Sequence, residues 1–382
     1  MKNMKIVIAP DSFKGSLTAK QVSQSIQKGF KQVFPDAKYV LVPMADGGEG
    51  TVQSLVDATN GKLKELEVVG PLGNKVKAKY GILGDGITGV IEMAEASGIG
   101  YVNKDTKNPL ITTTYGTGEL IKACIDSGVK KIIIGIGGSA TNDGGAGMAE
   151  ALGVKFLDSK GKDIPRGGGG LSQLAKIDIS GVDPKVYQTE IIIASDVTNP
   201  LCGKTGASYV FGPQKGATPE MILTLDANLR HYADLIKKQL GKDVADVPGT
   251  GAAGGLGAGL LVFTNSKMQK GIDIVVDYVK LVNELKDADL CITGEGGIDY
   301  QTQYGKAPFG VAQAAKKANP KLPVVAIAGT LGKDIEALYE KGFDAIFGTI
   351  EEVAQLEDII AKAEESLVRT SINVARALKI KL

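Results

Sequence analysis

The stretch KIVIAPDSFKGSLTAKQVSQSIQKGFKQVFPDAKYVLVPMADGGEG, residues 5–50, decides the fold class. It begins with a short β-branched run that ends at Pro10, which predicts a buried strand. Ser16 or Thr18 is placed to cap a helix, and apolar residues then recur at helical spacing: Val22, Ile26, Phe30 and Val33. A second apolar strand follows and leads through a glycine-rich turn into another helix. Strands joined by helical crossovers imply a parallel sheet, so the chain is predicted to be an α/β protein.

The rest of the chain interrupts this pattern and then returns to it. Residues 64–83 alternate polar and apolar side chains, as an antiparallel pair of strands does. Residues 130–153 and 190–201 each start with an isoleucine-rich strand, and the α/β rhythm resumes near residue 280. An amphipathic helix is predicted for the tail. The simplest topology is nested: residues 1–66 and 283–382 form one discontinuous α/β domain, and residues 67–282 form a second domain inserted into it.

Composition excludes several classes of protein. The 382 residues carry 44 Lys and Arg against 43 Asp and Glu, a net charge of +1, so nucleic acid is not an expected partner. No segment approaches the ~18 consecutive apolar residues of a membrane span, and neither a membrane nor a secretory signal is predicted. Cys124, Cys202 and Cys291 form no disulfide or metal pattern, which favours the reducing cytoplasm. The single histidine, His231, lies in a helical pattern, so catalytic triads and histidine metal sites are not expected.

Four loops combine glycine with acidic side chains directly after an apolar strand. They are ADGGEG at 45–50, GGSATNDGG at 137–145, ASDVTNP at 194–200 and TGEGGID at 293–299. Ligands of parallel α/β sheets bind where such loops leave the carboxyl ends of the strands. Backbone N–H groups together with carboxylates suit a phosphate and its Mg²⁺. The four loops therefore predict a phosphate-handling site.

Three stretches have features of nucleotide-binding motifs. The GKT at 203–205 is no Walker A loop, because Thr198 stands where the motif needs glycine. GTGAAG at 249–254 follows no strand and is a weak dinucleotide signal. GIGGSA at 135–140 does lie between a strand and a helix, with Asp158 about 20 residues further on, as in dinucleotide-binding proteins. A hydroxy-acid dehydrogenase with a dinucleotide cofactor therefore stays an alternative, as does a non-enzymatic regulator that binds a metabolite.

Eight blocks, in this order along the whole chain, resemble the bacterial glycerate kinase family. They lie at 9–19, 42–51, 113–121, 135–148, 195–203, 210–217, 251–260 and 292–308, the last reading ITGEGGIDYQTQYGKAP. The resemblance implies phosphorylation of D-glycerate by ATP with Mg²⁺, with 2-phosphoglycerate favoured and 3-phosphoglycerate possible. It also implies two α/β domains with a cleft between them, the middle one flavodoxin-like. One position departs from the pattern: Gly297 stands where arginine is frequent in the family, and Lys306 is the nearby cation that could substitute for it.

Phosphoryl transfer needs positioned reactants, neutralised charge and a base for the attacking hydroxyl. Lys14 is expected to meet the glycerate carboxylate or the transferred phosphate. Asp196 is the favoured base or metal ligand, because the mainly apolar residues before it predict burial and a tuned pKa. Asp46 is the further catalytic candidate, and Glu295 and Asp299 are the further metal candidates. Contacts with the substrate or the nucleotide are predicted for Ser12, Glu49, Gly137, Gly138, Ser139, Thr141, Asn142, Asp143, Lys215 and Lys306. The protein is expected to act as a monomer or homodimer on a small-molecule substrate.

Overall fold

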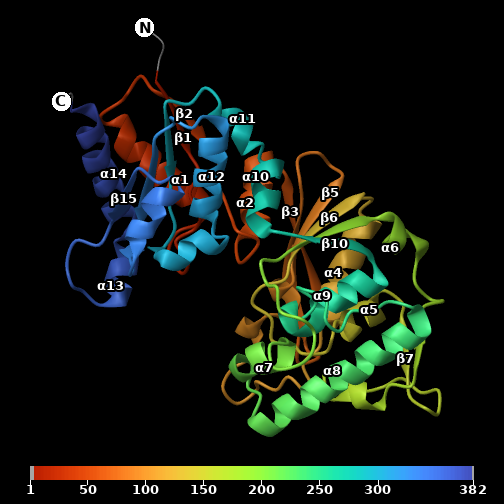
Figure 1. The fold of residues 1–382 in the computed structure, drawn as a ribbon. Helices are drawn as coiled ribbons and strands as arrows, with labels where there is room; N and C mark the ends of the chain where they lie inside the picture. Colours follow the sequence, from red (N-terminus) through yellow and green to blue (C-terminus); the bar gives the residue numbers. More distant parts are fainter. Residues whose placement is uncertain (1–3, 381–382) are drawn as a thin grey trace. The chain divides into compact units, whose positions relative to one another are not determined.

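The computed structural model describes residues 4–380 and divides into two compact units (Figure 1). The first unit comprises Met1–Asp46, Gln53–Asn60 and Gly271–Leu382. The second comprises Gly47–Val52 and Gly61–Lys270. The sequence predicted domain boundaries near residues 66 and 282. In the structure the boundaries lie at residues 60 and 270, and the short segment 47–52 also belongs to the second unit.

The first unit is built on a sheet of five parallel strands. Its spatial order is β2 (Lys38–Leu41), β1 (Lys5–Ile8), β11 (Leu290–Thr293), β13 (Val324–Ala328) and β15 (Ala345–Gly348). Counted along this unit, the order is 2-1-3-4-5, which is the flavodoxin-like order. The resemblance implied this order for the middle domain, whereas here it occurs in the first unit. The order depends on β1 pairing with β11, a contact between distant parts of the chain that local patterns do not reveal.

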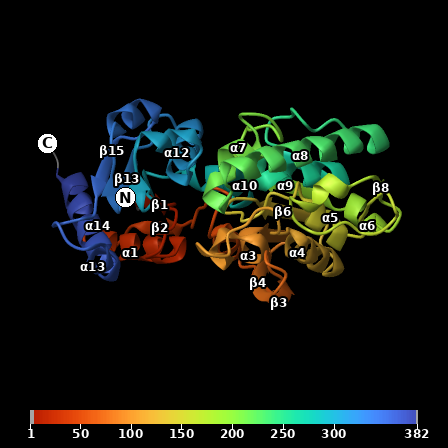
Figure 2. The ribbon, with the colours of Figure 1, turned by 90° about the horizontal axis from the view of Figure 1, so that it is seen from below.

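Helices cover both faces of this sheet, with α1 (Ala19–Lys31) and α14 (Ala363–Lys379) on one face and α12 (Ala307–Ala318) on the other (Figure 2). Ile6 and Ile8 pack with the predicted helical positions, all buried, in one core cluster. Thr18, not Ser16, caps α1 through a capping box with Gln21, which confirms the predicted start. The unit also contains α2 (Thr51–Thr59, from Gln53 on), α10 (Gly271–Tyr278), α11 (Leu281–Leu285), α13 (Leu356–Ala361), β12 (Gly297–Ile298), β14 (Thr330–Leu331) and the 3₁₀ turns η4 (Tyr300–Tyr304) and η5 (Ile335–Lys341).

The second unit has a mixed sheet whose strands follow chain order. They are β3 (Lys62–Val69), β4 (Lys75–Ile82), β5 (Thr88–Glu92), β6 (Lys131–Gly135), β9 (Glu190–Ala194) and β10 (Asn265–Gln269). β3 and β4 pair antiparallel, as the alternation at 64–83 predicted, and β5, β6, β9 and β10 are parallel. Because neighbours in this sheet are also neighbours in the chain, the strand order never reverses and provides no topological switch point.

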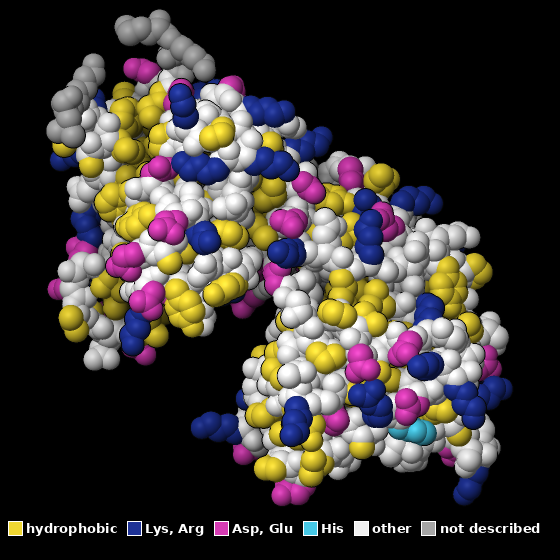
Figure 3. Space-filling view, viewed as in Figure 1, with side chains coloured by type: hydrophobic (Ala, Val, Ile, Leu, Met, Phe, Trp, Pro, Cys, Tyr) yellow, Lys and Arg dark blue, Asp and Glu magenta, His cyan; other side chains and the backbone are white. Residues whose placement is uncertain are grey.

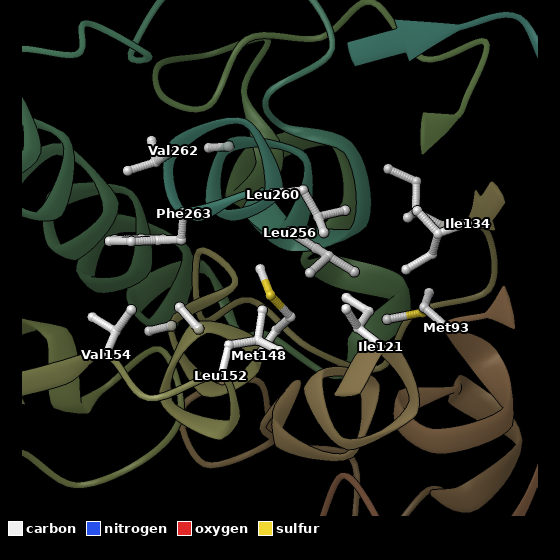
Figure 4. Packing of buried hydrophobic residues seen from close by; sticks show 14 of the residues in the cluster. Met93, Ile121, Ile134, Met148, Leu152, Val154, Leu256, Leu260, Val262 and Phe263 are labelled. Atoms are coloured by element: carbon white, nitrogen blue, oxygen red, sulfur yellow. The ribbon is translucent and has the colours of Figure 1, made fainter. Parts of the chain in front are cut away.

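Helices pack on this sheet around an extensive hydrophobic core. Figure 4 shows Met93, Ile121, Met148 and Leu256 converging there, and all four are fully buried. The remaining elements are α3 (Ala94–Ser97), α4 (Tyr115–Asp126), α5 (Ala146–Ala151), α6 (Pro184–Gln188), α7 (Ala207–Phe211), α8 (Pro219–Leu240), α9 (Ala252–Phe263), the pair β7 (Lys155–Leu157) and β8 (Lys176–Asp178), and the turns η1 (Ile99–Tyr101), η2 (Gly170–Gln173) and η3 (Pro213–Lys215).

The charged side chains on the surface agree with the charge balance of the sequence. On the face drawn in Figure 3, basic and acidic side chains of the described residues intermingle.

Between residues 4 and 380, none of the helices combines the length and the apolarity that crossing a membrane takes.

Candidate functional site

The loops after β1 and β11 meet at the carboxyl edge of the first unit's sheet. Here the strand order reverses, which is where open α/β sheets bind their ligands. The backbone N–H of Asp11 donates to Gly294 O at 2.8 Å, and Met44 N–H donates to Pro10 O at 2.9 Å. A Cβ on Gly296 would lie 3.4 Å from the Cα of Phe13, so the two loops are in contact. The main chain at Asp11 is thus held from both neighbouring strands.

Acidic side chains gather at this switch point. Asp11 is 4% exposed, and burial is the main cause that raises its pKa to about 7. The negative charges of Asp46 and Glu295 raise this pKa further. The backbone N–H of Ser12, 2.6 Å from Oδ1 of Asp11, and the charge of Lys14 act in the opposite direction. A carboxyl group is therefore fixed beside a lysine and two further acids.

Glu295 is held by partners of its own. Its carboxylate accepts from Thr302 Oγ1 at 2.9 Å and pairs with Lys306 Nζ at 3.3 Å. Both partners favour the charged form, yet burial outweighs them and the pKa of Glu295 is raised. Lys306 Nζ also donates to Gly297 O at 3.2 Å. Lys306 therefore reaches the position where relatives were expected to carry an arginine.

The first unit brings together several residues that the sequence singled out. Ser12 and Lys14 lie on the loop after β1, and Glu295 lies on the loop after β11. Asp46 follows the neighbouring strand β2, and Lys306 is the N-cap residue of α12 and pairs with Glu295. Lys14 is exposed and Ser12 is half-buried, so both are open to a solute.

Two placements in the first unit differ from the expectations. Asp299 lies further along the chain and caps η4, accepting from Gln301 N–H at 2.8 Å. Asp11 was missed by the sequence reasoning. Its signal was its place directly after the strand-ending Pro10.

The glycine-rich loop of the second unit, between β6 and α5, is closed to solvent at its polar residues. Thr141, Asn142 and Asp143 are 0% exposed. The carboxylate of Asp143 accepts from Thr114 N–H at 2.8 Å, from Thr114 Oγ1 at 2.9 Å and from the backbone N–H groups of Gly145 and Gly147 at 3.1 and 3.3 Å. Burial nevertheless raises its pKa.

Lys215 reaches the same loop from η3. It is 1% exposed, and its Nζ donates to Thr141 O at 2.7 Å. Burial lowers its pKa to about 7, against the opposing effect of Asp143. Three side-chain atoms in this region have no hydrogen-bond partner in the described structure: Thr141 Oγ1, Asn142 Oδ1 and Tyr232 OH. In this conformation the cluster fixes the loop, and Gly137 and Gly138 are its exposed members, with Ser139 8% exposed.

Two further predicted residues of the second unit are exposed. Asp196 follows β9 and is exposed, so the prediction that the preceding apolar strand buries it is wrong. The strand buries its own side chains, but the chain has left the sheet by residue 196. Glu49 is also exposed.

Glu92, the last residue of β5, is a buried acid that the sequence did not single out. The carboxylate of Glu92 accepts from Val52 N–H at 2.8 Å, and burial raises its pKa to about 7.

Among residues 4–380, no three His, Cys, Asp or Glu side chains are grouped so that they could hold a metal ion by themselves. The acids of the switch point therefore do not form an all-protein metal cage.

Comparison with known proteins agrees with the whole-chain pattern of motifs. The model of the glycerate kinase family matches residues 6–379. Glycerate kinase of Haemophilus influenzae is 55% identical over 99% of this chain and 100% of that protein. Glycerate 2-kinase of Escherichia coli is 52% identical over 99% of this chain and 98% of that protein. A solved structure described as glycerate kinase 2 from Salmonella typhimurium LT2 superposes with a TM-score of 0.91 at 53% identity, covering 99% of each chain. The chain belongs to the glycerate kinase family.

Proposed function

We propose that the protein transfers the terminal phosphoryl group of ATP to a hydroxyl of D-glycerate and that 2-phosphoglycerate is the favoured product. One observation carries the proposal: a chain that matches the family over residues 6–379 gathers acids and lysines at the switch point of a flavodoxin-like sheet. The name of the Escherichia coli relative supports the 2-position over the 3-position.

We assign roles from the surroundings of each side chain. Lys14 meets the negative charge of the transferred phosphoryl group or of the glycerate carboxylate. Asp11 is the base that accepts the proton of the attacking hydroxyl, because its main chain is fixed by Gly294 and its side chain lies beside Lys14. Lys306 supports Glu295. Asp196 lacks the burial that motivated its assignment as base, and its role in the reaction remains a prediction.

The acids of the switch point suit a magnesium ion that arrives with the nucleotide. Mg²⁺ is usually held by one or two carboxylates together with substrate phosphates, rather than by a protein cage. Asp46 and Glu295 would hold it here, since their charges already act on one another and on Asp11. When bound, the ion neutralises charge on the phosphate oxygens. Asp299 is less suited, because its carboxylate already caps η4.

Phosphorus NMR of the reaction mixture tests substrate, reaction and position together. We expect the signal of 2-phosphoglycerate to grow with ADP when the protein, ATP, Mg²⁺ and D-glycerate are combined. A signal of 3-phosphoglycerate would correct the position alone. Unchanged ATP would overturn the proposed function.

The same mixture separates the two alternatives. A non-enzymatic regulator would saturate with D-glycerate and release no ADP. A dehydrogenase would bind NADH in a fluorescence titration, and we expect no such binding. The loop at 135–140 that suggested it belongs to a sheet without a switch point, and its polar residues are closed to solvent.

We also place the protein in the cytoplasm. Cys124, Cys202 and Cys291 are free and buried, as thiols are in a reducing compartment.

A further inference from the structure

A cavity of about 260 Å³ opens beside the switch point, within the first unit. This volume is slightly below the ~300 Å³ at which small-molecule sites typically start. The cavity therefore suits one ring system and its substituents, but not a whole nucleotide. Its lining residues come from the loops that follow β1, β11, β13 and β15, from α13 and from the start of α14. Its apolar wall and an adjacent hydroxyl come from Phe13, Ser16, Ile350, Leu356, Ile359 and Ala363.

The charged side chains around this cavity are of both signs, and the apolar wall leaves the interior to an uncharged group. Three acids and two lysines line it: Glu351, Glu352, Asp358, Lys14 and Lys362. Glu351 is engaged with Arg369 and accepts from Ser366 Oγ at 3.1 Å. Glu352 pairs with Lys362 Nζ at 3.9 Å, and Asp358 is the remaining acid of the wall. A carboxylate on such a wall accepts hydrogen bonds from sugar hydroxyls, as the acidic residue of dinucleotide-binding folds does. The cavity is thus built for a flat neutral ring that carries hydroxyl groups.

One polar atom in the wall lacks a partner. Ser16 Oγ is buried and makes no hydrogen bond within the described structure. A buried polar group without a partner is uncommon, and a ligand that fills the cavity would provide one. The orphan hydroxyl therefore points to a ligand with ring nitrogens or hydroxyls.

The cavity and the acidic cluster share part of their walls. Lys14 and Gly296 line the cavity, and the same two loops carry Asp11 and Glu295. A ligand that spans both places has a neutral ring at one end and a negatively charged chain at the other. We propose that the cavity holds the adenosine part of ATP, with the ring against Phe13 and Ile359, the ribose toward the acids, and the phosphates leaving past Lys14. This inference rests on the proposed function and adds to it the unit that binds the nucleotide.

A matched pair of variants tests the inference. Ala363→Phe fills the cavity, whereas Ala361→Phe adds the same ring two residues earlier at an exposed position that does not line it. We expect Ala363→Phe to weaken ADP binding, measured by calorimetry without glycerate, by about tenfold or more, since small changes of pocket volume have effects of this size. The KM for ATP should rise in parallel, and the KM for D-glycerate should stay near that of wild type. Ala361→Phe should match wild type in all three.

A second measurement uses the unmodified protein and does not depend on the folding of a variant. Irradiation with 8-azido-ADP, followed by peptide mapping, should place the label within residues 349–366. If the protein makes phosphoglycerate but the label falls on residues 137–145 or 210–217, or if Ala363→Phe binds ADP as Ala361→Phe does, the adenosine assignment is overturned. If wild type binds no ADP and makes no phosphoglycerate, the proposed function itself has failed.

Discussion

At the scale of single residues, Asp11 is more buried than Asp46 and Glu295, the other two acids at the switch point. It is 4% exposed, and its backbone N–H is bonded to Gly294 O at 2.8 Å. We expect Asp11→Asn to lower kcat by about 10²- to 10⁴-fold, the usual contribution of a positioned base, with little change in ADP affinity. Steady-state kinetics and calorimetry measure both. Asp36→Asn, at an exposed turn of the same unit, is the control and should keep full activity. An active Asp11→Asn enzyme would remove Asp11 from the role of base.

Glu92 carries a pH dependence of stability. Its pKa is about 7 in the folded protein and 4.5 in the unfolded chain, because burial disfavours the carboxylate. Between these values the folded state binds more protons than the unfolded state, so stability falls as pH rises through this window. At pH 8 the loss amounts to at most about 3 kcal/mol. Below pH 4.5 both states are protonated and the loss vanishes.

Glu92→Gln tests this, since the amide oxygen still accepts from Val52 N–H. Calorimetry should show a higher melting temperature than wild type at pH 8 and a difference that shrinks toward pH 5. Glu67→Gln, at an exposed position of β3, is the matched control and should shift melting at neither pH. A gain that is the same at both pH values would rule out the charge of Glu92 as the cause.

At the scale of elements, Asp143 joins the starts of two helices. It accepts from Thr114, which precedes α4, and from the backbone N–H groups of Gly145 and Gly147 at the start of α5. A carboxylate at two helix N-termini is stabilised by both helix dipoles.

Asp143→Asn leaves buried donors unpaired, and we expect it to destabilise the second unit by about 3–5 kcal/mol, as the loss of one member of a buried charged network does. Asp196→Asn, at an exposed site, should change stability by less than about 0.5 kcal/mol. Denaturant unfolding followed by circular dichroism measures both changes. Equal stability of the two variants would show that Asp143 does not tie the helices together.

Local sequence patterns predicted helices and strands better than they predicted the burial of individual side chains. The strand at β1, the cap at Thr18 and the antiparallel pair β3–β4 follow from residues within a few positions of one another. The burial of Thr141–Asp143 depends on Lys215 and on Thr114, which are distant in sequence, and so a loop with the composition of a binding loop is closed instead. Asp11 was overlooked, and the burial of Asp196 was wrongly predicted, for the same reason. The number of apolar residues before an acid does not tell whether the chain turns back into the protein or out of it.

At the scale of the whole molecule, the chain divides into two units with separate cores. Phe30 belongs to the core of the first unit, and Leu256 belongs to that of the second. Both side chains are 0% exposed. The chain passes between the units more than once, because segment 47–52 belongs to the second unit and 53–60 to the first. Separate cores joined by an interleaved chain raise the question of whether the units unfold independently.

We expect independent unfolding and test it with two core truncations. Phe30→Ala should cost about 3–5 kcal/mol and Leu256→Ala about 2–5 kcal/mol, through lost burial and the cavity that remains. Hydrogen exchange at native conditions reports which strands open. Phe30→Ala should speed exchange in β1, β11 and β13 and leave β5, β6 and β9 near wild type, and Leu256→Ala should do the reverse. If either substitution speeds exchange equally in both sheets, the interleaved chain makes the two units one cooperative structure.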